Sequence, residues 1–283
     1  FSSFIFNTGG QTGRLGGSLA NFLANYDTVT YPWLNDTSRY NVTTAGIQQW
    51  YVPDTGTYRI TAEGASGEGP GATQAQGALI RGDFSLTAGD ELRIVVGQVG
   101  TSVQSNDASG GGGSFVVKSP FNTNASILVI AGGAGGRNDD TGYGTWSASN
   151  AQGQSGNNGG ASYNGGTAGT GGYGGDNGNQ TTQGGAGFFG NSIDSTTGSS
   201  KIPAQSFTNN SVGGYANWTG SNAGYGGFGG GGASGRGANF GPAGGGGGYS
   251  GGAAGYNSQY GGGGGSYNNG TNQVNTAGGS SSN

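Results

Sequence analysis

The chain has 283 residues, of which 9 are basic and 13 acidic, and it contains no cysteine, histidine or methionine. These counts exclude disulfides, thiolate nucleophiles, histidine acid–base catalysis and the usual zinc sites, and the net charge of −4 argues against a nucleic-acid partner. Glycine supplies 72 residues, but the glycines come in runs and only 6 prolines accompany them, which excludes a collagen triple helix. No apolar run approaches the ~20 residues of a membrane span, so we expect none.

The N-terminal segment Phe1–Phe6 (FSSFIF) is short and rich in aromatic residues, which predicts a strand. Two interpretations of this strand stay open. It is either the first strand of its own sandwich or a strand donated to a neighbouring copy, and in the second case Phe1, Phe4 and Phe6 form the assembly strand. Because side chains alternate along a strand, Phe4 and Phe6 are expected on one face together with Ser2.

One short α-helix is predicted near the N-terminus, because residues 15–26 carry four apolar side chains at helical spacing: Leu15, Leu19, Phe22 and Leu23. Short apolar or alternating runs with turn signals between them then predict about seven strands. The clearest runs are Tyr58–Glu63, Ala78–Ile80, Asp83–Leu86, Leu92–Val96, Ser114–Val117 and Ile127–Ile130. Short strands at this spacing indicate a β-sandwich or jelly roll, which we assign to residues 1–131.

Residues 132–283 form a second, glycine-rich part in which single aromatic residues interrupt the glycine runs. Two interpretations of this glycine-rich part stay open. It is either a disordered tail or a set of polyglycine-II helices, which have three residues per turn and can bond laterally because glycine has no Cβ. Few charges and many aromatic residues favour order. The sequence therefore predicts a mainly β protein in which a sandwich and a bundle of polyglycine-II helices pack as one unit.

Four stretches in this order resemble a known family: GIQQWYVPDTGTYRITAEGASG, GALIRGDFSLTAGDELRIVVGQVG, GGGGSFVV and ILVIAGGAGG. They are similar to the extracellular glycine-rich domain of the anaplastic lymphoma kinase and leukocyte tyrosine kinase receptors. The resemblance implies a sandwich of tumour-necrosis-factor-like type beside polyglycine-II helices. In the receptors this domain binds small helical cytokines. The family cysteines expected near Gly9 and Phe22 are missing here, so we transfer neither a cross-link nor a ligand-contact residue.

Sequence features that could indicate catalysis or metal binding are weak. The glycine run at 110–113 leads into a strand and not into the helix that a phosphate-binding loop needs. Carboxylates that could bind calcium or hydrolyse a glycoside show no ligand loop, and we expect them at the surface: Asp54, Asp83, Asp90, Asp139, Asp140, Glu63, Glu68 and Glu91. We therefore expect no enzyme activity, no cofactor and no metal site.

Seven sequons make candidate glycosylation sites, at Asn35, Asn41, Asn124, Asn179, Asn209, Asn217 and Asn269. Their number is close to chance for a chain so rich in Asn, Ser and Thr. They acquire meaning only if the chain passes through a glycosylating secretory route, in which case glycans attached to Asn join the list of partners.

The sequence favours an extracellular or cell-surface structural protein whose copies assemble into a fibre or coat, with copies of itself as the main partner. Stiff packing of the expected polyglycine-II helices, the low charge and the lack of recognisable catalytic residues support this hypothesis. The alternative is a secreted recognition module, such as an adhesin or a ligand-binding glycine-rich domain. The shed ectodomain of a receptor is a third and weaker possibility.

Overall fold

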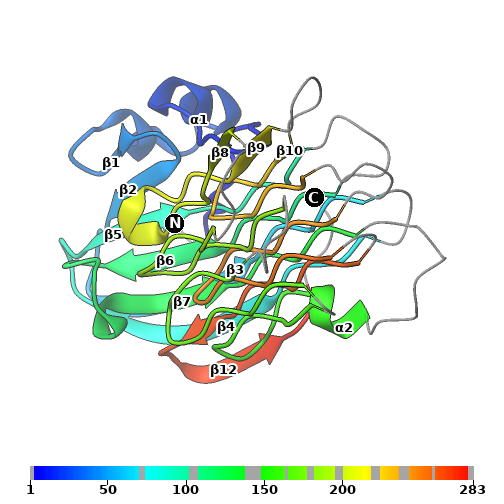
Figure 1. The fold of residues 1–283 in the computed structure, drawn as a ribbon. Helices are drawn as coiled ribbons and strands as arrows, with labels where there is room; N and C mark the ends of the chain where they lie inside the picture. The colour runs from blue at the N-terminus through cyan, green and yellow to red at the C-terminus, as the bar shows by residue number, and fades with distance from the viewer. Residues whose placement is uncertain are drawn as a thin grey trace.

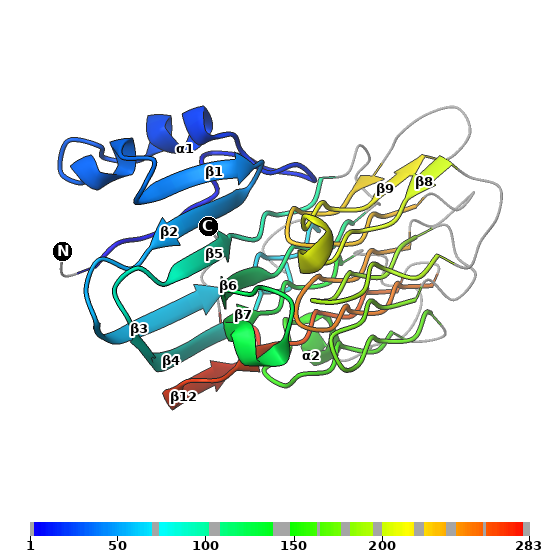
Figure 2. The same ribbon diagram turned by 90° about the vertical axis from the view of Figure 1, so that its left-hand side faces the viewer.

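A computed structural model describes residues 3–69, 74–101, 108–137, 148–162, 165–176, 182–194, 200–217, 224–235, 242–256 and 259–279. The protein is mainly β, with antiparallel sheets at one end and glycine-rich segments extending from them to the other end (Figures 1 and 2). No helix in the described ranges combines the length and the apolar composition needed to cross a lipid bilayer.

The elements follow one another along the chain in a fixed order. The helical elements are α1 (Leu19–Asn25), η1 (Pro32–Asn35), η3 (Asn124–Ser126), α2 (Ala148–Ala151) and η4 (Phe207–Asn209). The first seven strands are β1 (Tyr40–Thr44), β2 (Ile47–Tyr51), β3 (Gly56–Glu63), β4 (Leu79–Leu86), β5 (Glu91–Val95), β6 (Ser114–Lys118) and β7 (Ile127–Ala131). The later strands are β8 (Ser200–Ile202), β9 (Tyr215–Asn217), β10 (Gly224–Tyr225), β11 (Tyr267–Asn268) and β12 (Thr271–Thr276).

Two antiparallel sheets form the sandwich. One has six strands in the order β1-β2-β5-β6-β7-β11, and the other has three in the order β12-β4-β3. Their facing side chains build one core, to which both sheets contribute large apolar residues such as Trp50, Ile80, Phe84, Leu92 and Val129. The predicted β-rich sandwich is therefore confirmed, and its finer tumour-necrosis-factor-like type stays a prediction.

Strand β4 differs from its prediction. We expected two strands separated at Gly82, but one strand runs from Leu79 to Leu86 and pairs with β3 along its whole length. The position of Gly82 explains the difference. A Cβ there would lie 2.7 Å from the side-chain oxygen of Asn268 and 3.0 Å from the ring of Phe84, so glycine admits a close side-chain approach and does not mark a turn.

The N-terminal part also differs from its prediction. The helix is shorter than residues 15–26, since Ser18 caps α1 and the capping box with Asn21 fixes its first turn. The expected strand at Phe1–Phe6 is not formed in the residues described, because residues 3–6 lie outside every strand. Phe1 and Ser2 lie outside the described residues.

Part of the outer face of the six-stranded sheet is also buried. Aromatic residues of the glycine-rich part cover it, namely Phe188, Phe207, Phe228 and Tyr249. They pack on Phe115 and Ile127 of the sheet and on other residues of this second cluster. The single aromatic residues between glycine runs therefore attach the glycine-rich part to the sandwich.

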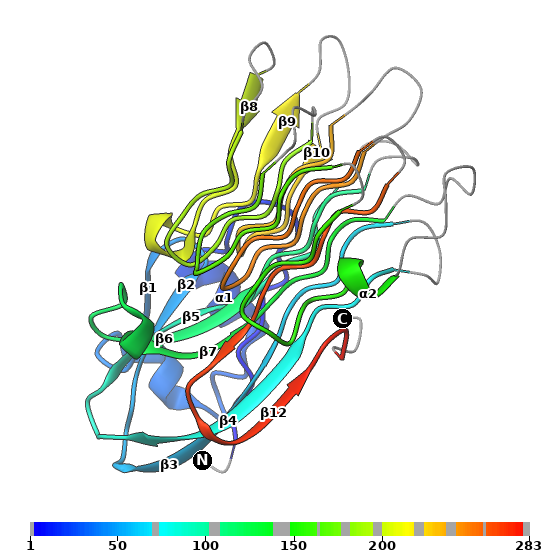
Figure 3. The same cartoon turned by 60° about the horizontal axis from the view of Figure 1, so that its bottom comes forward.

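The glycine-rich segments lie side by side as undulating traces (Figure 3), and they hydrogen bond laterally to one another. The run at 244–249 shows the pattern best. The N–H groups of Gly244 and Gly247 donate to the carbonyls of Ala108 and Gly111, three residues apart, at 2.9 and 3.0 Å. The N–H groups of Gly245 and Gly248 donate to the carbonyls of residues 183 and 186. The N–H groups of Gly246 and Tyr249 donate to the carbonyls of residues 262 and 265.

Every third N–H group of this run thus donates to the same neighbouring segment, and the three sets of N–H groups reach three different segments. A helix with three residues per turn and no internal hydrogen bonds requires this period. The segment at 261–265 repeats it, since Gly261 and Gly264 donate to Gly136 and Gly133. We call this arrangement the glycine lattice. Its lateral hydrogen bonds give the buried backbone N–H and C=O groups partners without a β-ladder.

The division into residues 1–131 and 132–283 stays a prediction, although the C-terminal strands connect the two ranges. Strand β11 pairs with β7, and β12 pairs with β4. The chain therefore returns from the glycine lattice to both sheets of the sandwich.

Candidate functional site

An aromatic slot near the N-terminus receives the side chain of Phe4. We define the slot by Tyr26, Tyr31 and Trp33, whose ring centroids lie 5.2, 5.0 and 4.9 Å from that of Phe4, all in edge-on geometry. Phe6 lies 4.8 Å from Phe4 and continues the contact to Trp50 in the sandwich core. Edge-on aromatic pairs add about 0.5–1.5 kcal/mol each beyond their area burial.

A buried polar network fixes the segment that follows Phe6. The hydroxyls of Tyr26 and Tyr40 both donate to the Gln48 side-chain oxygen, at 2.6 and 2.9 Å. The Asn7 N–H donates to the Tyr26 hydroxyl at 2.9 Å, and the Gln48 amide donates to the Asn7 carbonyl at 3.1 Å. Burial raises the pKa of Tyr26 to about 12 and also raises the pKa of Tyr40, so both hydroxyls stay protonated as donors.

The two described members of the predicted assembly strand share one face, as expected. Phe4 and Phe6 are half-buried and touch each other, whereas Ser3 and Ile5 point outward, with Ile5 81% exposed. In this single chain they pack against residues of the same molecule. The N-terminus lies at the sandwich end, away from the glycine lattice (Figures 2 and 3).

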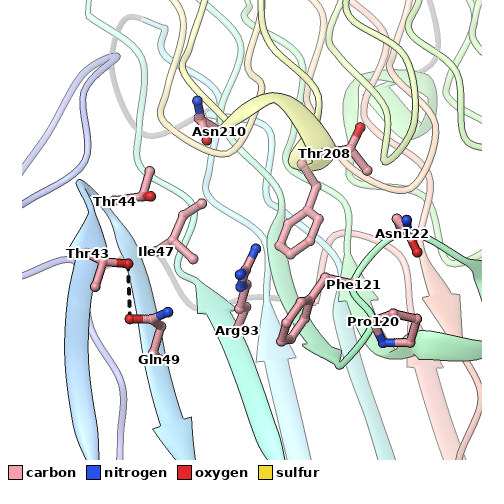
Figure 4. A pocket seen from close by; sticks show the side chains of 11 residues that line it. Thr43, Thr44, Ile47, Gln49, Arg93, Pro120, Phe121, Asn122, Thr208 and Asn210 are labelled. Atoms are coloured by element: carbon pink, nitrogen blue, oxygen red, sulfur yellow. Dashed lines mark hydrogen bonds between the residues drawn. The ribbon is translucent and has the colours of Figure 1, made fainter. Parts of the chain in front are cut away.

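A polar pocket lies on the outer face of the six-stranded sheet, where β1, β2 and β5 meet η4 (Figure 4). We call it the Arg93 pocket. Its volume is about 170 Å³, and its lining consists of Thr43, Thr44, Ile47, Gln49, Arg93, Pro120, Phe121, Asn122, Phe207, Thr208 and Asn210.

The guanidinium of Arg93 lies over the ring of Phe121, with its central carbon 3.9 Å from the ring centroid. Glu91 is the nearest acid, and its carboxylate oxygen is 3.8 Å from Arg93 Nε, which is too long for a hydrogen bond. Sequence reasoning missed this pocket. The alternation of Arg93 with Leu92 and Ile94 indicates that Arg93 points away from the sandwich core, but no sequence signal places Phe121 or η4 beside it.

The candidate calcium and glycosidase carboxylates that the structure describes are not brought together. Asp83 accepts two hydrogen bonds from Arg59 and one from Asn272, and the Arg59 bonds lower its pKa to about 2. Asp90 bonds Lys118 at 2.7 Å. Across the described ranges, no group of three or more acidic side chains could hold a metal ion, and Asp139 and Asp140 lie outside those ranges.

Four candidate glycosylation sites are exposed, at Asn35, Asn124, Asn209 and Asn269, and Asn41 is half-buried. Asn179 lies outside the described residues, and Asn217 ends β9 with no described side chain. Two of these sequons border the Arg93 pocket, since Thr43 belongs to the Asn41 sequon and Asn210 to the Asn209 sequon.

No sequence-family model matches the chain. A stretch of 71 residues, or 24% of the chain, is 44% identical to the leukocyte tyrosine kinase receptor of Mus musculus. The match covers 7% of that receptor's length. The chain is thus similar over about a quarter of its length to a small part of this receptor, which is the kind of protein that its strand motifs resemble.

Proposed function

We propose that this chain is an extracellular structural protein, a subunit whose copies join end to end into a fibre or surface coat. The observation that carries the proposal is the seating of Phe4 and Phe6. These two side chains hold a segment that lies outside every strand, at the end of the molecule remote from the glycine lattice. The same segment of a neighbouring copy can make the same contacts by exchange, which is a low-cost route to assembly.

Other features support this proposal. The lateral bonds of the glycine lattice suit a stiff subunit, because each glycine run is tied to several neighbours and not to one. With only 8% charged residues, the chain carries little charge that would oppose the packing of copies. A head-to-tail contact that does not close on itself produces an open filament.

The extracellular setting is part of the proposal. It is supported by the partial match to a receptor and by the exposure of four sequon asparagines, which suits a glycan-bearing surface. We infer that the glycine runs are polyglycine-II helices from the three-residue period of their hydrogen bonds.

A chain lacking residues 1–6 tests the assembly. We expect this truncated chain to fold and to stay monomeric in size-exclusion chromatography, whereas the complete chain forms filaments visible by electron microscopy. A peptide of residues 1–8 added to the truncated chain should occupy the empty slot. The matched peptide with Phe4→Ala should bind at least about tenfold more weakly, because half-burying a phenylalanine contributes about 1 kcal/mol and each edge-on aromatic contact adds about 0.5–1.5 kcal/mol.

Two outcomes would count against donation between copies. Filaments of unchanged length from the truncated chain would show that residues 1–6 are not the connector. Unfolding of the truncated chain, together with a monomeric complete chain, would mean that the segment belongs to its own sandwich.

A secreted recognition module is the second candidate, and the Arg93 pocket favours it. A concave site with a few convergent polar groups is the usual form of a binding site for a small ligand. A monodisperse monomer that binds a ligand would favour this alternative over the fibre.

A further inference from the structure

The Arg93 pocket plays no part in the assembly proposed for the N-terminal segment. We propose that it binds an acidic saccharide unit, with the sugar carboxylate on the Arg93 guanidinium and the sugar hydroxyls on the surrounding threonine and asparagine side chains. The proposal goes beyond the assembly function and does not depend on it.

The charge of the pocket selects an anion. Arg93 is the one charged side chain among the eleven that line it. Phe121 contacts the flat face of the guanidinium and Nε is buried, so the two terminal NH2 groups at its edge are the donors left for a ligand. The side chain of Arg93 makes no hydrogen bond to any described residue. Its ion-pair partner Glu91 lies 3.8 Å from Nε and accepts a hydrogen bond from Gln49 at 3.4 Å. A guanidinium with free donors fits a carboxylate in two-point geometry.

The remaining polar lining fits sugar hydroxyls. The side chains of Thr44, Asn122 and Asn210 make no hydrogen bond to any other described residue, and all three reach the pocket (Figure 4). Hydroxyl and amide groups can both donate and accept, which is what a ligand with several hydroxyls requires. Thr43 is already bonded to Gln49, at 3.1 Å, and this bond fixes one wall.

The size and the apolar wall fit a single ring. Pockets for drug-sized ligands have volumes of roughly 300–1,000 Å³. The Arg93 pocket, at about 170 Å³, is smaller and has room for one sugar ring, so any further units of a chain would lie outside it. Pro120 is exposed and supplies an apolar surface on which the C–H face of a sugar can pack, and the buried side chains of Ile47 and Phe207 lie behind the pocket.

Two sources could supply this ligand. Asn41 pairs with Gln49, and Gln49 pairs with Arg93, so the three residues form a row across β1, β2 and β5 on one face of the sheet. Adjacent strands lie about 4.7–4.9 Å apart, so a glycan on Asn41 would begin two strand spacings from Arg93 and an acidic unit further along that glycan could reach the pocket. A separate acidic polysaccharide would present the same chemistry.

The test uses the complete chain produced without glycosylation, titrated with glucuronate and with glucose by calorimetry or by ligand-observed NMR. We expect saturable binding of glucuronate, with glucose at least about tenfold weaker because it lacks the charged contact. Arg93→Gln should remove this preference. Arg39→Gln is the matched control, since Arg39 is exposed, pairs with Asp36 and lies outside the pocket; it should leave the preference unchanged.

Equal affinity for the two sugars, binding of neither, or an Arg93→Gln variant that binds glucuronate like the unaltered chain would each overturn the proposal. If Arg93→Gln does not fold, Asn210→Asp replaces it, because Asn210 is exposed and aspartate tolerates its left-handed backbone. The added charge should weaken glucuronate binding selectively, and an unchanged preference would again overturn the proposal.

Binding measurements on the glycosylated chain distinguish the two sources of the acidic sugar. If a glycan on Asn41 fills the pocket, the glycosylated chain should not bind added glucuronate, and Asn41→Gln should restore binding. If the glycosylated chain binds glucuronate as well as the unglycosylated chain does, the acidic sugar comes from a separate polysaccharide.

Discussion

Substitution of Gly246 by alanine is the sharpest test of the glycine lattice. An added Cβ would meet the carbonyl of Gly133, and that carbonyl accepts a hydrogen bond from Gly264 at 2.8 Å. Gly246 itself donates to Gly262 at 2.8 Å and accepts from Gly252 at 2.8 Å. The methyl group therefore enters a contact between backbones that cannot rotate away as a side chain could.

The magnitude follows from two costs. Inserting a methyl group into a close-packed interior costs typically about 1–3 kcal/mol. Weakening one of the hydrogen bonds around it adds about 0.5–1.5 kcal/mol. We expect Gly246→Ala to lower the free energy of unfolding by about 2–4 kcal/mol, against the gain of about 0.4–1 kcal/mol that alanine brings where the native backbone accepts it.

The assay is urea or thermal unfolding followed by circular dichroism. Gly156→Ala is the matched control, because Gly156 is exposed in the same glycine-rich part and a Cβ there has nothing within 4 Å. The control should be neutral or slightly stabilising. Equal effects of the two substitutions would refute the close backbone packing inferred for the lattice.

Four further predictions concern the sandwich and the N-terminal segment that packs beside it. Tyr26→Phe should cost about 1–3 kcal/mol in chemical denaturation, because it leaves the Asn7 N–H without its partner and removes a bond to Gln48. The pKa of Tyr26 is about 12 in the folded chain and about 10 when unfolded. The contribution of its protonated hydroxyl to the free energy of unfolding is therefore complete below pH ~10 and is lost as the pH rises toward 12. This loss of stability, measured by unfolding at several alkaline pH values, should be smaller in Tyr26→Phe. The pKa of Asp83 is about 2, so its pairing stabilises the fold above pH ~4 and is lost as the pH falls toward 2; unfolding curves of the unaltered chain and Arg59→Gln should therefore converge in acid. Ile127→Ala, at a fully buried position under the aromatic cover, should lower the free energy of unfolding by about 2–5 kcal/mol in the same assay.

The strands predicted from the sequence are those whose apolar side chains alternate or run together. Residues 58–63 fall within β3, and the runs at 114–117 and 127–130 fall within β6 and β7. Strand β2 was missed because its pattern is broken by Gln48, a polar residue that is fully buried by its bonds to two tyrosines. Strand β12 was missed because every residue of it is exposed, so burial leaves no pattern in its sequence.

The candidate sites also differ in how far the sequence predicts them. The shared face of Phe4 and Phe6 follows from alternation and was predictable from the sequence. The slot that receives Phe4 was not, because Tyr26 and Trp33 come from a helix end and a 3-10 turn whose positions depend on tertiary packing. The Arg93 pocket joins residues from positions 43 to 210, and no local pattern relates residues so far apart.

The bonding of the run at 244–249 bears on how the chain acquires its structure. Its three partner segments begin near residues 108, 183 and 262, so its hydrogen bonds close loops of very different lengths. During synthesis from the N-terminus, the segment at 108–111 has no partner in this run until residues 112–243 have been made. Contacts between distant parts of a chain form slowly because loop closure must come first. The lattice is therefore expected to form late and as a unit, and strands β1 to β7, which are synthesised before it, would serve as the surface on which it is built.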